Sequence, residues 1–179
     1  MNKKEALKQI KAGKDEEDND YFSLADADEK LKADKEVVLA AVKQTGLVLE
    51  YADEKLKAHK EVVLMAIKNN SYALQYANKK FKKDKKIVLT AVKQDKEREI
   101  TDGFALQFAD DSLKKDKEIV LEAVKQSSSA LQYADDSLKK NIDISFINFK
   151  KNSKKISLIE ISVLEGSALE RSALFKSVV

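Results

Sequence analysis

The sequence contains no cysteine and no proline, and it has only four glycines and one histidine among its 179 residues. Without cysteine the chain can form no disulfide, no thiol nucleophile and no cysteine-ligated zinc site. Proline and glycine are the residues least compatible with a helix interior, so their scarcity predicts a mostly helical chain.

The chain also lacks a strong excess of either charge and a long apolar run. It has 34 Lys and Arg against 31 Asp and Glu, and a net charge of +3 does not by itself indicate a nucleic-acid or membrane partner. Arg98 and Arg171 are the only arginines, which disfavours bidentate recognition of bases or phosphates. No segment approaches the ~20 apolar residues of a membrane span, and the opening "MNKKEALKQIKAG" predicts a polar amphipathic helix rather than a secretory signal. We therefore expect a cytoplasmic protein without a membrane partner.

What the sequence does contain is one motif written four times. "DKEVVLAAVKQ" begins at Asp34, "HKEVVLMAIKN" at His59, "DKKIVLTAVKQ" at Asp84 and "DKEIVLEAVKQ" at Asp116. The starts are 25, 25 and 32 residues apart, and a further 25 residues lead to Asn141. A period of this size indicates stacked repeats, and the long interval implies an insertion near residues 95–101.

Each copy of the motif predicts a short amphipathic helix. Asp34 is suited to cap its start, and Glu36 and Lys43 suit the two ends of the helix dipole. A helix of about ten residues is marginal alone, so it must pack against its neighbours. Gly46 and Gly103 mark the turn after the helix, where Ser71 and Ser128 stand in the other copies.

The second part of the repeat reads "LVLEYADEKLKA" from Leu47, and its later copies begin at Tyr72, Phe104 and Ser129. The polar residue after the alanine is a second cap candidate in each copy: Asp53, Asn78, Asp110 and Asp135. This pattern leaves open whether the segment is one helix or two short turns. Leu106 is expected to be fully buried and Lys114 to face solvent. The aromatic column Tyr51, Tyr76, Phe108 and Tyr133 is expected to fill the core between units rather than to stack on bases.

These patterns predict an all-α fold of tandem ~25-residue helical repeats forming a short α-solenoid-like array. Residues 1–33 read as a degenerate N-terminal capping repeat, and residues 34–140 as four tandem repeats. Residues 141–179 read as a diverged C-terminal segment, because Ser145 and Asn148 stand at apolar positions of the motif. This tail is expected to be an irregular cap, a looser segment or the result of a reading-frame change.

The combined pattern "DKEVVLAAVKQTGLVLEYADEKLKA" and its copies resemble the DUF4116 repeat family over about residues 22–140. The resemblance implies tandem helical repeats of a kind found in bacterial and other proteins. It implies no catalytic residue and no cofactor.

The residues that could carry chemistry have simpler interpretations. His59 stands where other copies have Asp or Asn, so we interpret it as a substitute cap rather than an acid–base group, and no second His or Cys could complete a metal site. The acidic run "DEEDND" from Asp15 lacks the Gly and Glu of a calcium-binding loop and is expected to be a solvated loop. We expect no enzyme, no metal and no cofactor.

The remaining signal lies in the solvent columns. One lysine ladder ends the long helices (Lys43, Lys68, Lys93, Lys125), and a second lies in the other part of the repeat (Lys57, Lys82, Lys114, Lys139). A glutamine column accompanies them: Gln75, Gln107 and Gln132. We predict a non-enzymatic scaffold that binds an unknown protein partner through the first ladder and the glutamine column. The less favoured alternative is weak electrostatic nucleic-acid binding along the lysine ladders.

Overall fold

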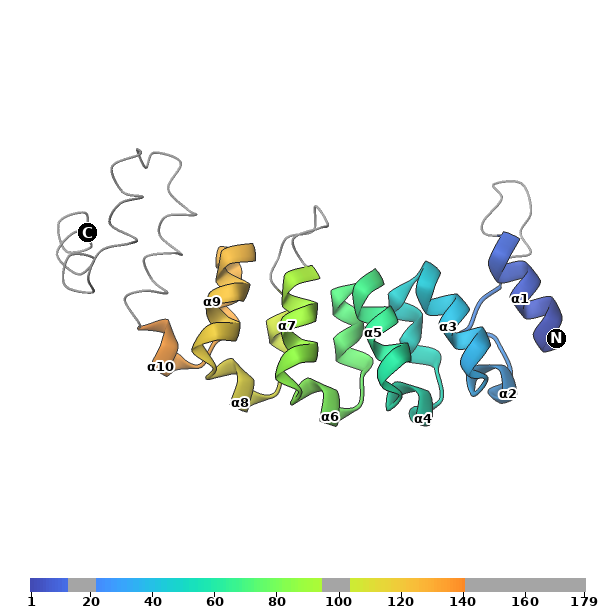
Figure 1. The fold of residues 1–179 in the computed structure, drawn as a ribbon, viewed down its shortest axis with the longest axis horizontal. Helices are drawn as coiled ribbons and strands as arrows, with labels where there is room; N and C mark the ends of the chain where they lie inside the picture. Colours follow the sequence, from blue (N-terminus) through green and yellow to red (C-terminus); the bar gives the residue numbers. More distant parts are fainter. Residues whose placement is uncertain (13–21, 95–103, 141–179) are drawn as a thin grey trace.

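The protein is an elongated stack of short helices, and its structure is a computed structural model that describes residues 1–12, 22–94 and 104–140. Within these ranges every regular element is an α-helix or a 3-10 helix. Figure 1 shows the elements succeeding one another along a single axis. The predicted all-α repeat array is therefore confirmed. The acidic run 15–20, the insertion near 95–101 and the segment 141–179 lie outside the described residues.

Long α-helices of ten residues form one layer of the array, with each helix packed against the next (Figure 1). Their bounds are α1 Lys3–Ala12, α3 Lys35–Gln44, α5 Lys60–Asn69, α7 Lys85–Gln94 and α9 Lys117–Gln126. Asp34 caps α3 by accepting from the N–H groups of Glu36 at 3.0 Å and Val37 at 3.2 Å, and Asp116 caps α9 in the same way. The caps predicted from the motif therefore begin these helices.

The second part of each repeat divides into two elements. A 3-10 helix comes first: η1 Gly46–Tyr51, η2 Ser71–Tyr76, η4 Phe104–Phe108 and η5 Ser128–Tyr133. A four-residue α-helix comes second, and among the described short helices only α2 has no 3-10 helix before it. These short helices are α2 Glu29–Lys32, α4 Glu54–Lys57, α6 Lys79–Lys82, α8 Asp111–Lys114 and α10 Asp136–Lys139. The first unit has a turn at residues 24–26 in place of the 3-10 helix. Figure 1 shows the labelled short helices along one edge of the array, which we call the short-helix edge; it includes the first turns of the long helices.

The division falls at the polar residue that the sequence marked. The chain leaves η1 at Ala52 in an extended conformation (φ −69°, ψ 152°), and Asp53 then accepts from the N–H of Lys55 at 2.8 Å. Asn78, Asp110 and Asp135 cap the later short helices in the same way. Short polar side chains bond to local backbone, so they favour a helix start over a helix interior. Of the two alternatives that the sequence left open, the structure has two elements.

Main-chain hydrogen bonds join consecutive short helices. The N–H of each cap residue donates to the last carbonyl of the preceding short helix: Asp53 to Lys32, Asn78 to Lys57, Asp110 to Lys82 and Asp135 to Lys114, all at 2.9–3.0 Å. A carbonyl at a helix end lacks an intrahelical partner. The next repeat therefore satisfies it, without the help of any side chain.

The apolar columns form one continuous core. Leu49, Leu74 and Leu106 are 0% exposed, so the predicted burial of Leu106 is confirmed. The aromatic column is less buried than expected: Tyr51 is 42% exposed, and Tyr76, Phe108 and Tyr133 are only partly buried against the core. The prediction that this column fills the core is therefore wrong for Tyr51. Tyr51 lies beside the first unit, which has a turn in place of a 3-10 helix and so covers less of its ring.

Gly46 permits a close approach between neighbouring repeats. A Cβ atom at this position would lie 2.3 Å from the carbonyl oxygen of Ala66 and 2.9 Å from the amide nitrogen of Asn70. The sequence suggested a glycine for the conformation of the turn, but the structure requires one because the first turn of η1 contacts the end of α5. Its N–H donates to Oδ1 of Asn69 at 2.6 Å.

Candidate interaction surface

The structure separates the two sets of residues predicted as one surface. The first lysine ladder, Lys43, Lys68, Lys93 and Lys125, is exposed at the C-terminal ends of the long helices. The glutamines Gln75, Gln107 and Gln132 lie near the ends of 3-10 helices that lead back to the short helices. The carbonyl oxygen of Gln75 accepts from Lys82 of α6 at 2.6 Å, which places it beside the short-helix edge. The lysines and glutamines therefore lie at opposite ends of the repeat unit.

The second lysine ladder is largely neutralised within the short helices. Three of its four members, and Lys32 in the first unit, pair with an acid three residues earlier: Lys32 with Glu29 at 3.2 Å, Lys57 with Glu54 at 2.9 Å, Lys114 with Asp111 at 3.1 Å and Lys139 with Asp136 at 2.9 Å. Side chains three residues apart share one helix face, so these pairs form without distortion. Lys114, expected to face solvent, keeps only 25% of its side chain exposed.

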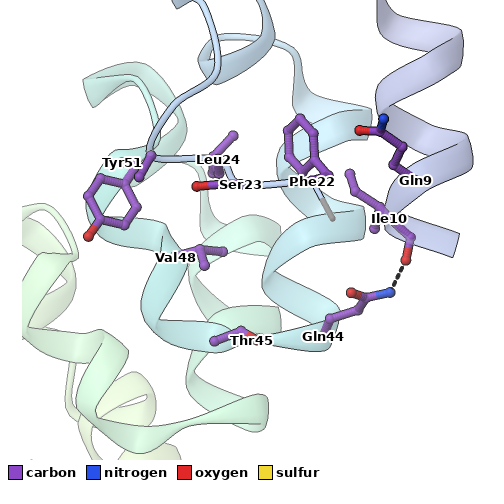
Figure 2. Close-up of a pocket in the computed structure, with 10 residues that line it drawn as sticks. Gln9, Ile10, Phe22, Ser23, Leu24, Gln44, Thr45, Val48 and Tyr51 are labelled. Atoms are coloured by element: carbon purple, nitrogen blue, oxygen red, sulfur yellow. Dashed lines mark hydrogen bonds between the residues drawn. The ribbon is translucent and has the colours of Figure 1, made fainter. Parts of the chain in front are cut away.

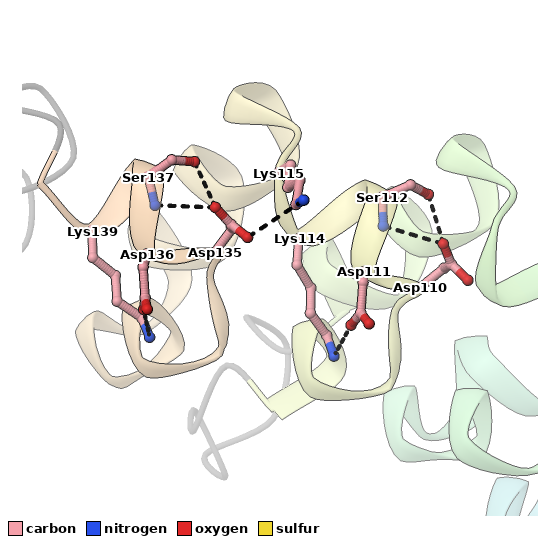
Figure 3. A network of polar contacts seen from close by, with 9 residues as sticks. All are labelled: Asp110, Asp111, Ser112, Lys114, Lys115, Asp135, Asp136, Ser137 and Lys139. Carbon is pink, nitrogen blue, oxygen red and sulfur yellow. Dashed lines mark hydrogen bonds and ion pairs between the residues drawn. The ribbon is translucent and has the colours of Figure 1, made fainter.

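Figure 3 shows this neutral arrangement at α8 and α10. Asp110 accepts from both the N–H and the hydroxyl of Ser112, and Asp135 accepts in the same way from Ser137. These hydrogen bonds lower the pKa of both carboxyl groups. Lys115 lies 3.9 Å from Asp135 and so joins the two repeats. Every lysine drawn thus has a carboxylate beside it.

A second series of ion pairs joins the long helices at their first turns. Lys3 of α1 contacts Asp34 at 3.0 Å and Glu36 at 2.8 Å, and Lys85 of α7 contacts Asp116 and Glu118, both at 2.7 Å. These hydrogen bonds raise the pKa of both lysines. Burial raises the pKa of Asp34 and of Asp116, but the lysine and the backbone N–H groups outweigh it, so the pKa of each is lowered. The first lysine of one helix therefore binds the acids that open the next.

His59 weakens this series in the second repeat. It occupies the N-cap position of α5, as expected, but its side chain makes no capping hydrogen bond. Its Nδ1 is buried and has no hydrogen-bond partner within the described chain. Lys35 consequently contacts only Glu61, at 2.6 Å.

The third repeat keeps only Asp84, which caps α7 by accepting from the N–H groups of Lys86 and Ile87. Lys79 replaces the acid that opens the other short helices, Asn78 replaces the capping aspartate, and Lys86 replaces the glutamate found at Glu36, Glu61 and Glu118. Residues 78–86 therefore hold six lysines and one aspartate, a net charge of +5. The equivalent residues 28–36, 53–61 and 110–118 have net charges of −1, 0 and −1.

The lysines of this repeat find other partners in place of the missing acids, but not all of them do. Lys82 has no acid at residue 79 and donates instead to the carbonyl of Gln75. Burial, and next the charge of Lys79, lower the pKa of Lys82. Lys83 lies 3.7 Å from Asp110, and Lys80 lies 4.9 Å from the ring centre of Phe81. No ion pair is present at Lys60, Lys79 or Lys86 within residues 22–94 and 104–140.

We call this cluster the central basic edge and define it as Lys60, Lys79, Lys80, Lys83 and Lys86, all exposed. It lies on α6 and its C-cap and on the first turns of α5 and α7. Lys60 occupies the position from which Lys35 reaches Glu61 and Lys85 reaches Glu118, and the residue at the position of those glutamates in the next repeat is Lys86. The sequence comparison of apolar columns missed this cluster, although a count of charge for each repeat would have found it.

A pocket of about 280 Å³ lies at the other end of the described array, between the end of α1, residues 22–25 and η1 (Figure 2). Phe22, Leu24 and Val48 are among its apolar residues, and Gln9 and Ser23 among its polar ones. The amide of Gln44 donates to the carbonyl of Ile10 beside it. Its lining, all within the described chain, includes no Asp, Glu, Lys, Arg or His. The pocket therefore offers hydrogen bonds and apolar contact but no carboxylate or imidazole.

The described residues form neither a metal site nor a membrane-spanning helix. In residues 1–12, 22–94 and 104–140, no group of three or more His, Cys, Asp or Glu side chains could hold a metal ion. The helices described in these ranges are all too short or too polar to cross a membrane.

Comparison with known proteins identifies the repeat. The family described as "Domain of unknown function (DUF4116)" matches residues 18–57, 59–97, 101–139 and 119–160. The last match extends beyond Lys140, where the resemblance seen in the sequence ended. No curated protein and no solved structure matches the chain. Because the family matches cover most of the sequence, the chain belongs to the DUF4116 family.

Proposed function

We propose that the chain is a non-enzymatic helical-repeat scaffold that binds a partner protein along its short-helix edge. The observation that supports this proposal is the contrast between constant interior and variable edge. Leu49, Leu74 and Leu106 repeat one buried position, while the charge of the edge changes from −1 or 0 to +5 in a single repeat. Repeat arrays use such extended surfaces for binding.

The charge change is difficult to explain by folding. Lys60 and Lys86 place like charges at positions that form an ion pair at the neighbouring seams, and the opening acid of α6 is absent. Exposed ion pairs contribute only ~0.2–1 kcal/mol each, so the array tolerates their loss, but it gains no stability from lysines in their place. A binding role for the exposed amines accounts for them.

The test is capture of partners by the immobilised full chain from a cell extract, with and without nuclease treatment. A captured protein is then purified and titrated calorimetrically against the chain. The proposal expects saturable binding by the purified protein that nuclease does not remove. Capture that disappears with nuclease would instead support the alternative, weak nucleic-acid binding along the lysine ladders, because phosphate contacts would then carry the association. Failure of every captured protein to bind directly would contradict the scaffold proposal.

A further inference from the structure

We infer that the central basic edge docks a short acidic segment of a partner protein, whose carboxylates take the places of the acids that the third repeat lacks. The inference rests on the scaffold proposal and names the chemistry of its partner. It follows from three features of the array: the contacts made at equivalent seams, the limited extent of the positive charge, and the charges on either side of it.

The array itself shows what binds a lysine at this position. Lys85 lies 2.7 Å from a carboxylate oxygen of Asp116 and 2.7 Å from one of Glu118. Lys3 makes the corresponding contacts to Asp34 and Glu36. At the seam between α5 and α7 the equivalent lysine is Lys60, and the second acid is replaced by Lys86. At those other seams, two carboxylates surround one lysine amine. Between Lys60 and Lys86, one carboxylate from another protein would instead contact two lysine amines.

A similar position exists on the short helix. Glu54 and Asp111 neutralise Lys57 and Lys114, whereas α6 offers Lys79 and Lys80 in its first turn. Lys79 lowers the pKa of Lys82, after burial, which is the effect of a nearby uncompensated positive charge. A second carboxylate of the partner would relieve that repulsion. The partner segment therefore needs at least two acidic residues, one for each position.

The surroundings of the edge limit the length of the partner. On one side, Asp111 and Asp136 keep 90% of their side chains exposed (Figure 3). On the other side, Glu54 is 80% exposed and Glu61 is 58% exposed. A polyanion longer than one repeat would meet these carboxylates and be repelled. A nucleic acid strand following the array is therefore disfavoured, and a short acidic peptide segment fits the +5 charge of residues 78–86.

The test exploits the neighbouring repeats as templates. In the full chain, the double variant Lys79→Glu and Lys86→Glu installs the residues found at Glu54 and Glu61. The new acids can pair with Lys82 and Lys60, so the fold is expected to be retained, which a thermal melt by circular dichroism checks. The matched control is Lys43→Glu with Lys68→Glu, which changes the net charge equally on the exposed ladder at the other end of the repeat.

The probe is a fluorescein-labelled peptide of alternating glutamate and serine, followed by fluorescence anisotropy at low ionic strength. The wild-type chain is expected to bind it, the double variant to bind more than about tenfold more weakly, and the control less than about threefold more weakly. A labelled single-stranded oligonucleotide of the same length is expected to bind more weakly than the peptide. If Lys79→Glu and Lys86→Glu destabilise the chain, Lys79→Gln with Lys86→Gln replaces them, because glutamine removes the charge without adding one.

Three results would overturn the inference: no binding of the peptide to the wild-type chain, equal losses in the double variant and its control, or preference for the oligonucleotide. These results leave the scaffold proposal standing if a captured protein still binds the Lys79→Glu, Lys86→Glu variant as tightly as the wild type. Absence of any protein partner, with the peptide bound as expected, would contradict the scaffold proposal alone.

Discussion

The short helices α6 and α8 lie in consecutive repeats and pack through the same apolar position, which is Phe81 in one and Leu113 in the other. Their other residues differ in net charge. In α8, Asp111 lies 3.1 Å from Lys114 (Figure 3), whereas in α6 the equivalent residue is Lys79, and Lys82 donates to a main-chain carbonyl instead. A neutral helix and a strongly basic helix thus occupy the same place in the fold. Packing therefore fixes the inner side of the repeat and leaves the charge of its edge free to vary.

Substitution of the shared interior should have the largest effect on stability. Leu106 is 0% exposed, and Leu106→Ala is expected to reduce the free energy of unfolding by ~2–5 kcal/mol through lost burial and a cavity. Urea denaturation followed by circular dichroism measures the change. A loss below about 1 kcal/mol would show that this position is less constrained than the comparison requires.

A smaller loss is expected where two repeats approach most closely. Gly46→Ala places a methyl group 2.3 Å from the carbonyl of Ala66, so η1 or α5 must shift. Overpacking of this kind typically costs ~1–3 kcal/mol, measured by the same denaturation. Ser71→Ala at the equivalent place in the next repeat is the control, because a Cβ is already accommodated there. Equal effects of the two substitutions would contradict the close contact.

Restoring the missing cap should stabilise the second repeat. His59→Asp would supply a carboxylate to the N–H groups of Glu61 and Val62, as Asp34 does for α3, and it would also attract Lys35. An N-cap of this kind is worth ~0.5–2 kcal/mol. We expect a raised melting temperature. Asp34→Ala is the reciprocal control and should lower it; an unchanged melting temperature for His59→Asp would mean that the cap of α5 contributes little.

The acid caps should make stability depend on pH at low pH. The pKa of Asp116 in the folded chain is lowered from its ordinary value of 3.8. Its contribution is therefore present above about pH 4 and is lost as the pH falls through the folded value. Asp116→Asn should flatten this part of a plot of melting temperature against pH. Asn78, the only amide among the caps of the described short helices, does not titrate, so Asn78→Asp should steepen the plot.

The smallest effect is expected on the edge itself. Lys114→Ala removes one ion pair to Asp111, whose side chain is 90% exposed, and the loss of such a surface pair typically costs less than about 1 kcal/mol. Denaturation of Lys114→Ala beside Leu106→Ala tests the comparison directly. Similar losses in the free energy of unfolding for the two variants would show that the edge and the interior contribute equally to stability.

The repeat, its period and its buried columns could be predicted because they depend on local patterns. The positions of Asp34 and Leu106 relative to the period define a cap and a core residue without knowledge of neighbours. The 3-10 helix could not be predicted, since Ser71–Tyr76 has no pattern that separates it from a turn of α-helix. Its geometry is decided by packing against the next repeat.

The candidate site was predicted less well, for a reason that is also physical. A ladder such as Lys57, Lys82, Lys114 and Lys139 looks uniform in sequence, but three of its members are neutralised by an acid three residues earlier and Lys82 is not. The exposed charge of a lysine depends on what lies beside it. Contacts between repeats, such as that from Lys85 to Asp116, span more than one period and do not appear in a column.

The main-chain hydrogen bonds between short helices determine how the array can change in length. The bond from Asp110 to Lys82 is 2.9 Å long, although the longest interval of the sequence separates these repeats, and the bond from Asn78 to Lys57 across an ordinary interval is 3.0 Å long. The insertion follows α7, at the far end of the unit from these bonds. The step between short helices is therefore independent of loop length and of side chains. A duplication of one whole repeat would extend the array by a single step and preserve the distance between every existing pair of neighbours.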